Sequence, residues 1–527
     1  MVAALLTKRH QRTPALAVAL LVVLTTLVGA WPNGPAARVL GAGDEVRIVA
    51  GAPATLDPAA AGDAGSAGVI GQLFETLTAI DPSLTVRPAL AERWDLTDDG
   101  RRIVFHLRDG LTFSDGSPLD ADDVVRSWLR VIDPDTPSPL VALMLDVRGA
   151  REYLAGDVGA DGVGLSAEGR QVQVELVRPA GEFASVVASP TFSVVPEGID
   201  DVDARDFVGS GGYVIAEETP AGLRLERNEH YWAGPAPIRT VHLIHDLGGR
   251  SSVQAFEDGD LDYTPIGDFD ASWIRFDPEL GPRLRSVPAL STEYLGFDTT
   301  RPPFDDVRVR QAFAQAIDWN RLVTLASSST VVPATSMVPP GIPGRSERNF
   351  LPPHDPDAAR TLLAEAGYPG GRGLPEITYL TGGSTVDAGF VADIRRELGI
   401  EVRFEAMDFG TYFDRLDEDA PQIWSLGWIA DYPGANDFLG VLLGTGSSNN
   451  YGGWSNAEFD EAIREAGETT DPDEARAAYD RAEEIVQRDA PVIPLAHSPG
   501  WALARDGLLG ATENGLGFLR LAGLAWE

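Results

Sequence analysis

Apolar residues follow two spacings along the chain, one typical of strands and one typical of helices. Alternating or short continuous apolar runs predict strands at residues 46–50, 102–107, 172–177, 241–244, 377–380, 401–406 and 492–497. Apolar residues three and four positions apart, often behind a capping residue, predict helices at residues 66–77, 121–130, 356–366, 387–398 and 472–488. Strands interleaved with helices predict an α/β fold of open sheets flanked by helices.

The segment of residues 294–322 joins a short strand, a turn and a helix. Residues 294–297 suit a strand, Pro302 and Pro303 fix the turn, and Asp305 or Asp306 can cap the helix that follows. The apolar positions of that helix recur at helical spacing and are Val309, Ala312, Phe313, Ala316 and Ile317. We interpret this segment as following a crossing between two bodies, with a second crossing near residues 491–497.

Composition limits the classes of protein that fit. The chain has 527 residues, of which 44% are hydrophobic, so it can form two or three units with cores of their own. Its formal net charge of −37 argues against nucleic acid and against an anionic membrane surface as partners. The absence of cysteine excludes disulfides and thiol catalysis.

The N-terminus has the features of a secretory signal. Basic residues precede an apolar run at residues 14–28, and Val28, Gly29 and Ala30 form a small-residue cleavage site. We therefore predict a signal peptide at residues 1–30 and a linker at residues 31–43. An uncleaved N-terminal anchor remains the alternative, although fifteen or so apolar residues are fewer than the roughly twenty that a spanning helix needs.

The sequence has no motif that indicates catalysis or a metal site. We find neither a nucleophile elbow nor a zinc-protease motif, and Gly209 to Gly212 lack the lysine of a phosphate loop. We therefore expect no enzyme activity and no cofactor. The remaining chemistry is recognition: residues 424–432, WSLGWIADY, place two tryptophans before one acid, which suits a cationic group on an apolar body.

Four blocks of sequence resemble a known family. They are residues 110–128, 225–232, 294–322 and 427–439, in this order along the chain. They are similar to the family 5 extracellular solute-binding proteins, the peptide- and nickel-type receptors of ABC importers, and most of all to the oligopeptide-binding members. This resemblance implies a two-lobed periplasmic-binding-protein-like fold with a cleft between the lobes. The expected boundaries are lobe I at 44–293 with a subdomain inserted at about 82–190, lobe II at 294–491, and a return to lobe I at 492–527.

The resemblance also implies ligand contacts in the segment that ends at Asp431. In the oligopeptide-binding relatives the matching aspartate pairs with the α-amino group of the peptide. Trp428 matches the tryptophan of the cleft, and Gly427 and Ile429 match positions whose main chain binds the peptide. Ser425 stands where some relatives carry a cation that holds a ligand carboxylate.

A second wall of the cleft is implied by a loop near the N-terminus. Its residues are Gly62, Asp63, Ala64 and Gly65, whose small side chains leave room for close approach. Leu140 matches a further pocket position, where an aromatic residue is familiar in the family, so this part of the pocket is expected to differ.

The resemblance implies a monomeric receptor outside the cytoplasmic membrane that captures a small-molecule ligand, expected to be a short peptide, for the membrane permease of an ABC transporter. The chain lacks the lipid-bearing cysteine found in many binding proteins of single-membrane bacteria, so its mode of attachment is open. Two alternatives also remain open. One is the same fold with a nickel chelate, a sugar oligomer or another small metabolite as ligand, and the other is a secreted hydrolase.

Overall fold

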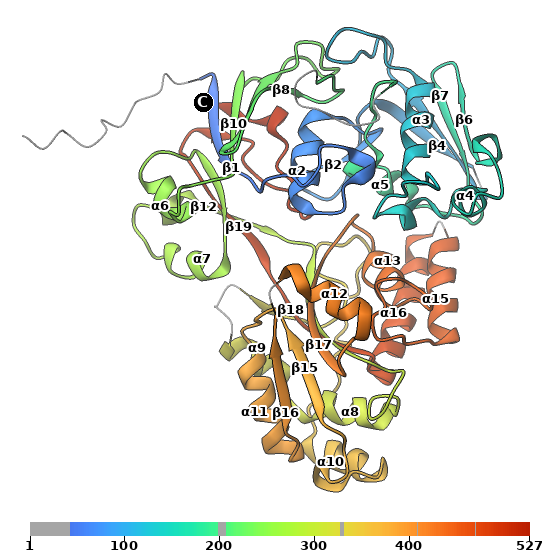
Figure 1. Ribbon diagram of the computed structural model, residues 1–527, viewed down its shortest axis with the longest axis vertical. Helices are drawn as coiled ribbons and strands as arrows, with labels where there is room; N and C mark the ends of the chain where they lie inside the picture. Colours follow the sequence, from blue (N-terminus) through green and yellow to red (C-terminus); the bar gives the residue numbers. More distant parts are fainter. Residues whose placement is uncertain (1–42, 98, 199–206, 327–330, 408, 470) are drawn as a thin grey trace, which may run out of the picture. The chain divides into compact units, whose positions relative to one another are not determined.

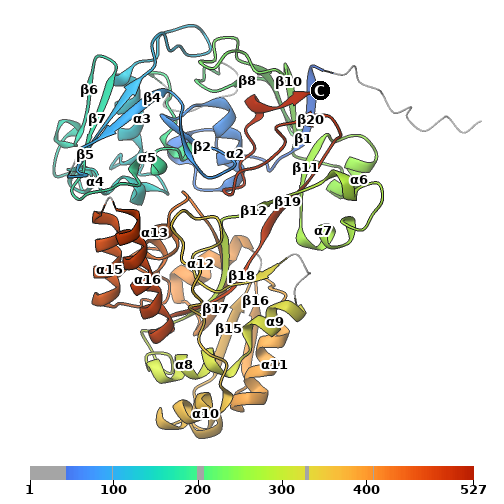
Figure 2. The ribbon, with the colours of Figure 1, turned by 180° about the vertical axis from the view of Figure 1, so that it is seen from behind.

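A computed structural model describes residues 43–527 apart from 98, 199–206, 327–330, 408 and 470 (Figures 1 and 2). The predicted signal peptide at 1–30 and residues 31–42 of the predicted linker lie outside the described residues. Residues 43–527 form one compact unit. No helix in the described part of this unit combines the length and the hydropathy that a membrane span requires.

The first sheet is built from segments that lie far apart in the sequence. Its seven strands are, in spatial order, β12 (Leu284–Pro288), β19 (Pro499–Ala504), β11 (Tyr263–Ile266), β1 (Glu45–Val49), β10 (Thr240–Ile244), β9 (Gly222–Arg227) and β8 (Tyr213–Thr219). β1 runs parallel to β10 and β11, and the other neighbours are antiparallel. The helices of this part are α2 (Ala64–Leu73), α6 (Ser252–Glu257) and α7 (Asp268–Ile274).

Helix α2 is shorter than the sequence pattern predicted. The apolar face of α2 is buried as expected, and Val69, Ile70 and Leu73 belong to the core beside the first sheet. The helix ends at Leu73 because Phe74 adopts extended backbone angles, φ −128° and ψ 156°, while its side chain stays in the same core. The predicted continuation to residue 77 is therefore wrong.

A second, four-stranded antiparallel sheet forms an inserted subdomain. Its order is β4 (Ala91–Leu96), β5 (Arg102–Leu107), β7 (Gln171–Glu175) and β6 (Leu165–Glu168). Two strands, β2 (Thr78–Ile80) and β3 (Val86–Pro88), form a hairpin just before it, and its helices are α3 (Ala121–Val131), α4 (Ala150–Leu154) and α5 (Phe183–Val186). Asp120 caps α3 through a capping box with Asp123, and Trp128 of α3 is completely buried in the subdomain core. Apart from β2, these elements lie between residues 82 and 190, and the boundaries of the insertion stay a prediction.

The third large sheet carries most of the C-terminal half. Its order is β14 (Val332–Pro333), β18 (Val492–His497), β13 (Ser291–Phe297), β17 (Ile423–Ile429), β15 (Ile377–Thr381) and β16 (Val402–Ala406). Its helices are α8 (Val307–Ala316), α9 (Trp319–Ala326), α10 (Pro356–Glu365), α11 (Asp387–Leu398), α12 (Phe409–Asp419), α13 (Ala435–Phe438), α14 (Gly440–Leu443), α15 (Ala457–Glu468) and α16 (Pro472–Asp489).

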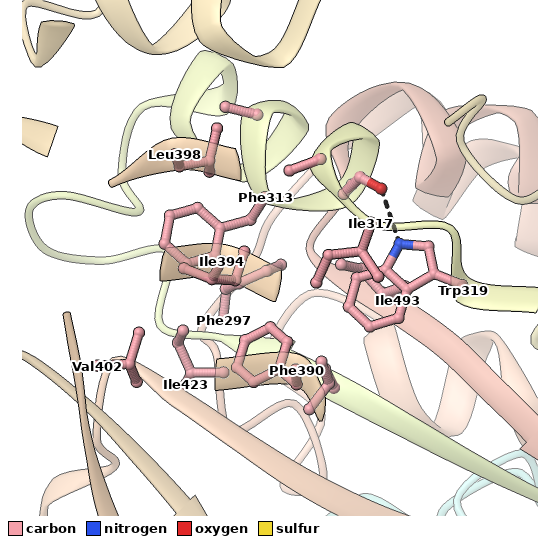
Figure 3. Packing of buried hydrophobic residues seen from close by; sticks show 14 of the residues in the cluster. Phe297, Phe313, Ile317, Trp319, Phe390, Ile394, Leu398, Val402, Ile423 and Ile493 are labelled. Carbon is pink, nitrogen blue, oxygen red and sulfur yellow. Dashed lines mark hydrogen bonds between the residues drawn. The ribbon is translucent and has the colours of Figure 1, made fainter. Parts of the chain in front are cut away.

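One hydrophobic core joins this sheet to helices α8, α9 and α11 (Figure 3). The predicted face of α8 is buried in it, and Phe313 packs edge-on against Phe297 of β13. Trp319 stacks on Phe390 of α11 while its Nε1 donates to the Ala314 carbonyl over 2.7 Å. Burial of the indole therefore leaves no unsatisfied donor.

The chain passes between the first sheet and the C-terminal sheet at two points. It leaves β12 at Pro288 and enters β13 at Ser291, and it leaves β18 at His497 and enters β19 at Pro499. The sequence had placed the return to lobe I at residue 492, yet β18 pairs with β13 and β14 of the C-terminal sheet. Every residue of β18 is buried, and the apolar pattern gives no sign of where the sheet changes.

Candidate functional site

The strand β17 has one edge that is only partly covered. β17 pairs along its whole length with β13, but with β15 only at Ile423 and Trp424, because β15 ends at Thr381. Within the described residues, no strand continues along this edge beyond Trp424. Leu426 to Ile429 therefore lie between β13 on one side and an uncovered edge on the other.

The register of β17 shows which main-chain groups point to that edge. Ala430 N donates to the Leu290 carbonyl over 2.8 Å, and hydrogen-bonded pairs alternate along an antiparallel ladder. Trp428 and Leu426 are thus bonded to β13, whereas the N–H and C=O groups of Gly427 and Ile429 point away from it. The Ile429 side chain is 57% exposed, so this end of the strand reaches solvent.

Ser425 is engaged inside the C-terminal lobe. Its Oγ lies 3.1 Å from the Thr381 Oγ1, and its carbonyl accepts from the Tyr412 hydroxyl over 2.6 Å. Thr381 in turn donates to Asp387 over 2.9 Å. The position where some relatives carry a cation is here part of a polar network, and the edge groups available for an added chain begin after it.

Asp431 and Trp428 stand at the end of β17, where the chain turns toward α13. Asp431 is half-buried, and this burial raises the pKa of its carboxyl to about 6. The Trp428 indole is also half-buried and packs with the core beside α13, α15 and α16. An ionised Asp431 would give this apolar corner a fixed negative charge, suited to an ammonium group.

Asp437 connects these two residues, and sequence reasoning missed it. Its Oδ2 accepts from the Trp428 Nε1 over 2.9 Å and from the Asp431 main-chain N over 3.2 Å. Asp437 is completely buried, and burial and the Asp431 charge together raise the pKa of its carboxyl well above the usual range. An acid six positions after Asp431 was visible in the sequence, but only the turn into α13 brings it back beneath the strand end.

The predicted residues of the N-terminal lobe form a separate group. Asp63 caps α2 by accepting from the Ser66 N over 2.9 Å, which gives its side chain a structural role. A Cβ added at Gly62 would lie only 2.7 Å from the Pro139 Cβ, so the loop of residues 62–65 lies directly against the turn that precedes Leu140. The structure thus brings Gly62 and the Leu140 turn together, while Asp431 and its neighbours belong to the C-terminal sheet.

A cavity of about 390 Å³ lies elsewhere in the N-terminal part. Its wall includes the second half of α2 and residues 512–523, and none of the ten predicted site residues lines it. The charges at this cavity are paired, with the Arg520 Nη2 2.7 Å from the Glu75 Oε2. In the described part of the chain, no three acidic or histidine side chains gather closely enough to hold a metal ion.

Two lobes built around separate sheets, an inserted subdomain and two crossings are the architecture of a solute-binding protein of the periplasmic type. The sequence profile of the bacterial extracellular solute-binding proteins, family 5 Middle, matches residues 85–450. The chain therefore belongs to this family, which confirms the resemblance of its four sequence blocks and the expected fold.

Similar proteins cover nearly the whole chain. The probable deoxycholate-binding periplasmic protein YgiS of Escherichia coli is 29% identical over 469 residues, which is 85% of this chain and 86% of that protein. The structure of the Escherichia coli murein tripeptide binding protein MppA matches with a TM-score of 0.80 and 26% identity, over 93% of this chain and 99% of the other. The Haemophilus influenzae OppA complex with RPPGFSPFR matches with a TM-score of 0.77 and 25% identity, over 92% and 99%.

Proposed function

We propose that this protein is the receptor of an ABC importer that captures short peptides outside the cytoplasmic membrane and delivers them to a membrane permease. The observation that carries the proposal is the uncovered edge of β17 with Asp431 at its end. An extended peptide can add to such an edge through its main chain, whatever its side chains are. Its terminal ammonium can then pair with Asp431.

The charges at the site favour a peptide over an anionic ligand. Asp431 and Glu182, which directly precedes α5, both raise the pKa of Asp437, so three carboxyl groups contribute to the charge at this corner. Deoxycholate, named for the relative YgiS, carries a carboxylate that these acids would repel. MppA and OppA are named for peptides, which carry an ammonium group.

The other parts of the proposal concern location and assembly. We place the mature protein outside the cytoplasmic membrane after cleavage near Ala30, as a monomer that binds without chemical conversion of its ligand. The division into two lobes, one with the first sheet and one with the C-terminal sheet that contains β13 and β18, together with the inserted subdomain, is part of this proposal. Closure of the two lobes on a ligand would proceed through the crossings beside β13 and β18.

Thermal unfolding with a library of two- to five-residue peptides, together with native mass spectrometry, tests the proposal. A ligand at one hundred times its Kd stabilises the folded state by about 2.7 kcal/mol. We expect peptides with a free amine to raise the Tm of the protein and to keep their own mass during the incubation. Stabilisation by nickel chelates, sugar oligomers or bile acids, with no response to peptides, would replace the peptide assignment, and cleaved peptides would indicate a hydrolase.

A further inference from the structure

Asp437 contacts both Asp431 and Trp428, the two predicted residues at the ammonium end of the site. One oxygen, Oδ2, accepts from the Trp428 indole and from the Asp431 main chain. The other oxygen, Oδ1, is buried and has no hydrogen-bond partner among the residues that the structure describes. A buried carboxylate oxygen without a donor is costly when ionised, and Oδ1 is therefore the atom on which a proton is best held.

Among the described residues, none of the main influences on the pKa of Asp437 is a cation. The groups that act on its pKa, besides burial, are the Asp431 and Glu182 carboxyls, which raise it, and hydrogen bonds from Trp428 and the Asp431 main chain, which lower it. Tyr432, whose pKa is raised by burial, Glu182, Asp437 and Tyr479, faces the same corner.

The arginine that acts on Glu182 is paired with another acid. Arg178 forms a salt bridge with Asp146 over 2.6 Å, and its charge acts on Glu182. Glu182 also has a hydrogen bond with Tyr432. Protonation of one carboxyl therefore lowers the charge of the Asp431 and Asp437 pair in the empty protein.

We propose that Asp437 is the positioning residue of the ligand site and that it shares one proton with Asp431 in the empty receptor, which the pair releases to solvent when a ligand ammonium binds. In the empty state the pair carries one negative charge, with the proton on Asp437. Binding of an ammonium adds one positive charge beside Asp431. Loss of the Oδ1 proton then leaves the pair with two negative charges, with the cation beside Asp431, and the released proton goes to water.

This inference has two consequences that differ from a structural role. Two coupled acids titrate in two macroscopic steps, and the Trp428 indole that donates to one of them should report both steps. Ligand binding should also be linked to proton release, because the ammonium favours the doubly ionised pair. The second consequence rests on the proposed function, whereas the first concerns the protein alone.

The variant Asp437→Asn tests the first consequence without any ligand. The amide oxygen can still accept from Trp428 and from the Asp431 main chain, but it holds no acid proton. In ¹⁵N-labelled wild type, with the indole signal assigned through Trp428→Phe, we expect the signal to move in two steps as the pH rises from 4 to 9. In Asp437→Asn we expect one step. The same titration in both proteins would overturn the shared proton.

Calorimetric titration with tri-alanine in buffers of different ionisation enthalpy tests the second consequence. We expect wild type to release protons on binding, Asp437→Asn to lose this release, and N-acetyl-tri-alanine to cause none. Glu483→Gln is the matched control, because Glu483 is a buried acid of the same lobe that bonds to Ser336 and Met337 and should leave the release unchanged. If tri-alanine binds without proton release in wild type, the pair is refuted. If tri-alanine does not bind at all, the peptide library decides the proposed function and the indole titration alone decides the pair.

Discussion

Replacement of Ile429 by proline removes one N–H group that the structure aims at an added peptide. Ile429 is the last residue of β17, and its main-chain groups point away from β13, so the loss leaves the ladder between β17 and β13 intact. Proline is tolerated at such strand ends, where the missing N–H faced no partner. The fold should therefore survive.

The cost falls on the ligand. A peptide carbonyl that bonded to this N–H loses its donor while the cleft still removes it from water. Such an unmatched bond costs about 1–3 kcal/mol, which weakens the Kd by about 5-fold to 150-fold. The exposed Ile429 side chain adds little, and Ile429→Ala, which keeps the N–H, measures that contribution separately.

Tryptophan fluorescence or calorimetry with one tight peptide gives the Kd of all three proteins, and circular dichroism confirms that each is folded. The difference between the proline and alanine variants isolates the amide. Equal affinities in the two folded variants would show that the β17 edge does not bind the peptide main chain.

Two further predictions concern buried acids of the structure, and a third concerns the N-terminal sequence. Asp431→Ala should leave a buried ammonium unpaired at a cost of about 3–5 kcal/mol, two to four decades of affinity for a free-amine peptide, but much less for its acetylated form; a loss below threefold would remove Asp431 from the site. Burial raises the pKa of Glu483 to about 7, so its protonated form adds stability that is present below pH 4.5 and lost as the pH rises through 7. The free energy of unfolding of Glu483→Gln in urea should therefore rise relative to that of wild type by up to about 3 kcal/mol between pH 4.5 and 8. Parallel pH dependence in the two proteins would contradict this. Mass mapping of the native N-terminus should find Trp31 first, whereas an intact Met1 in detergent-extracted protein would indicate an anchor.

Much of the local structure could be predicted because it depends on neighbouring residues. Asp120 before α3, Asp355 before α10 and Asp471 before α16 each accept from main-chain N–H groups of the first turn, as a capping residue does. The strand at residues 102–107 and the helix at 387–398 have the predicted bounds. In these segments short-range spacing carries the information.

Contacts between distant segments carried no such signal. The change of sheet between His497 and Pro499 lies between two apolar strands, so composition cannot locate it. The role of Ser425 depends on Tyr412 and Thr381, and that of Asp437 on a turn of unpredicted shape. The family resemblance identified the candidate residues at 425–431. Their possible role became visible only from the strand pairing, which leaves one edge of β17 uncovered.

The short uncovered edge of β17 also limits how many residues of a peptide this strand can bind. The Tyr412 hydroxyl already occupies the Ser425 carbonyl, so the rungs for a ligand are Gly427 and Ile429, separated by about 6.8 Å along the strand. A peptide whose amine sits at Asp431 would run antiparallel to β17 and meet both rungs within about its first three residues. The strand would thus contact only the amino-terminal residues of the peptide, and the residues that follow would make no main-chain hydrogen bond with β17. Other parts of the protein would therefore determine any preference for peptide length.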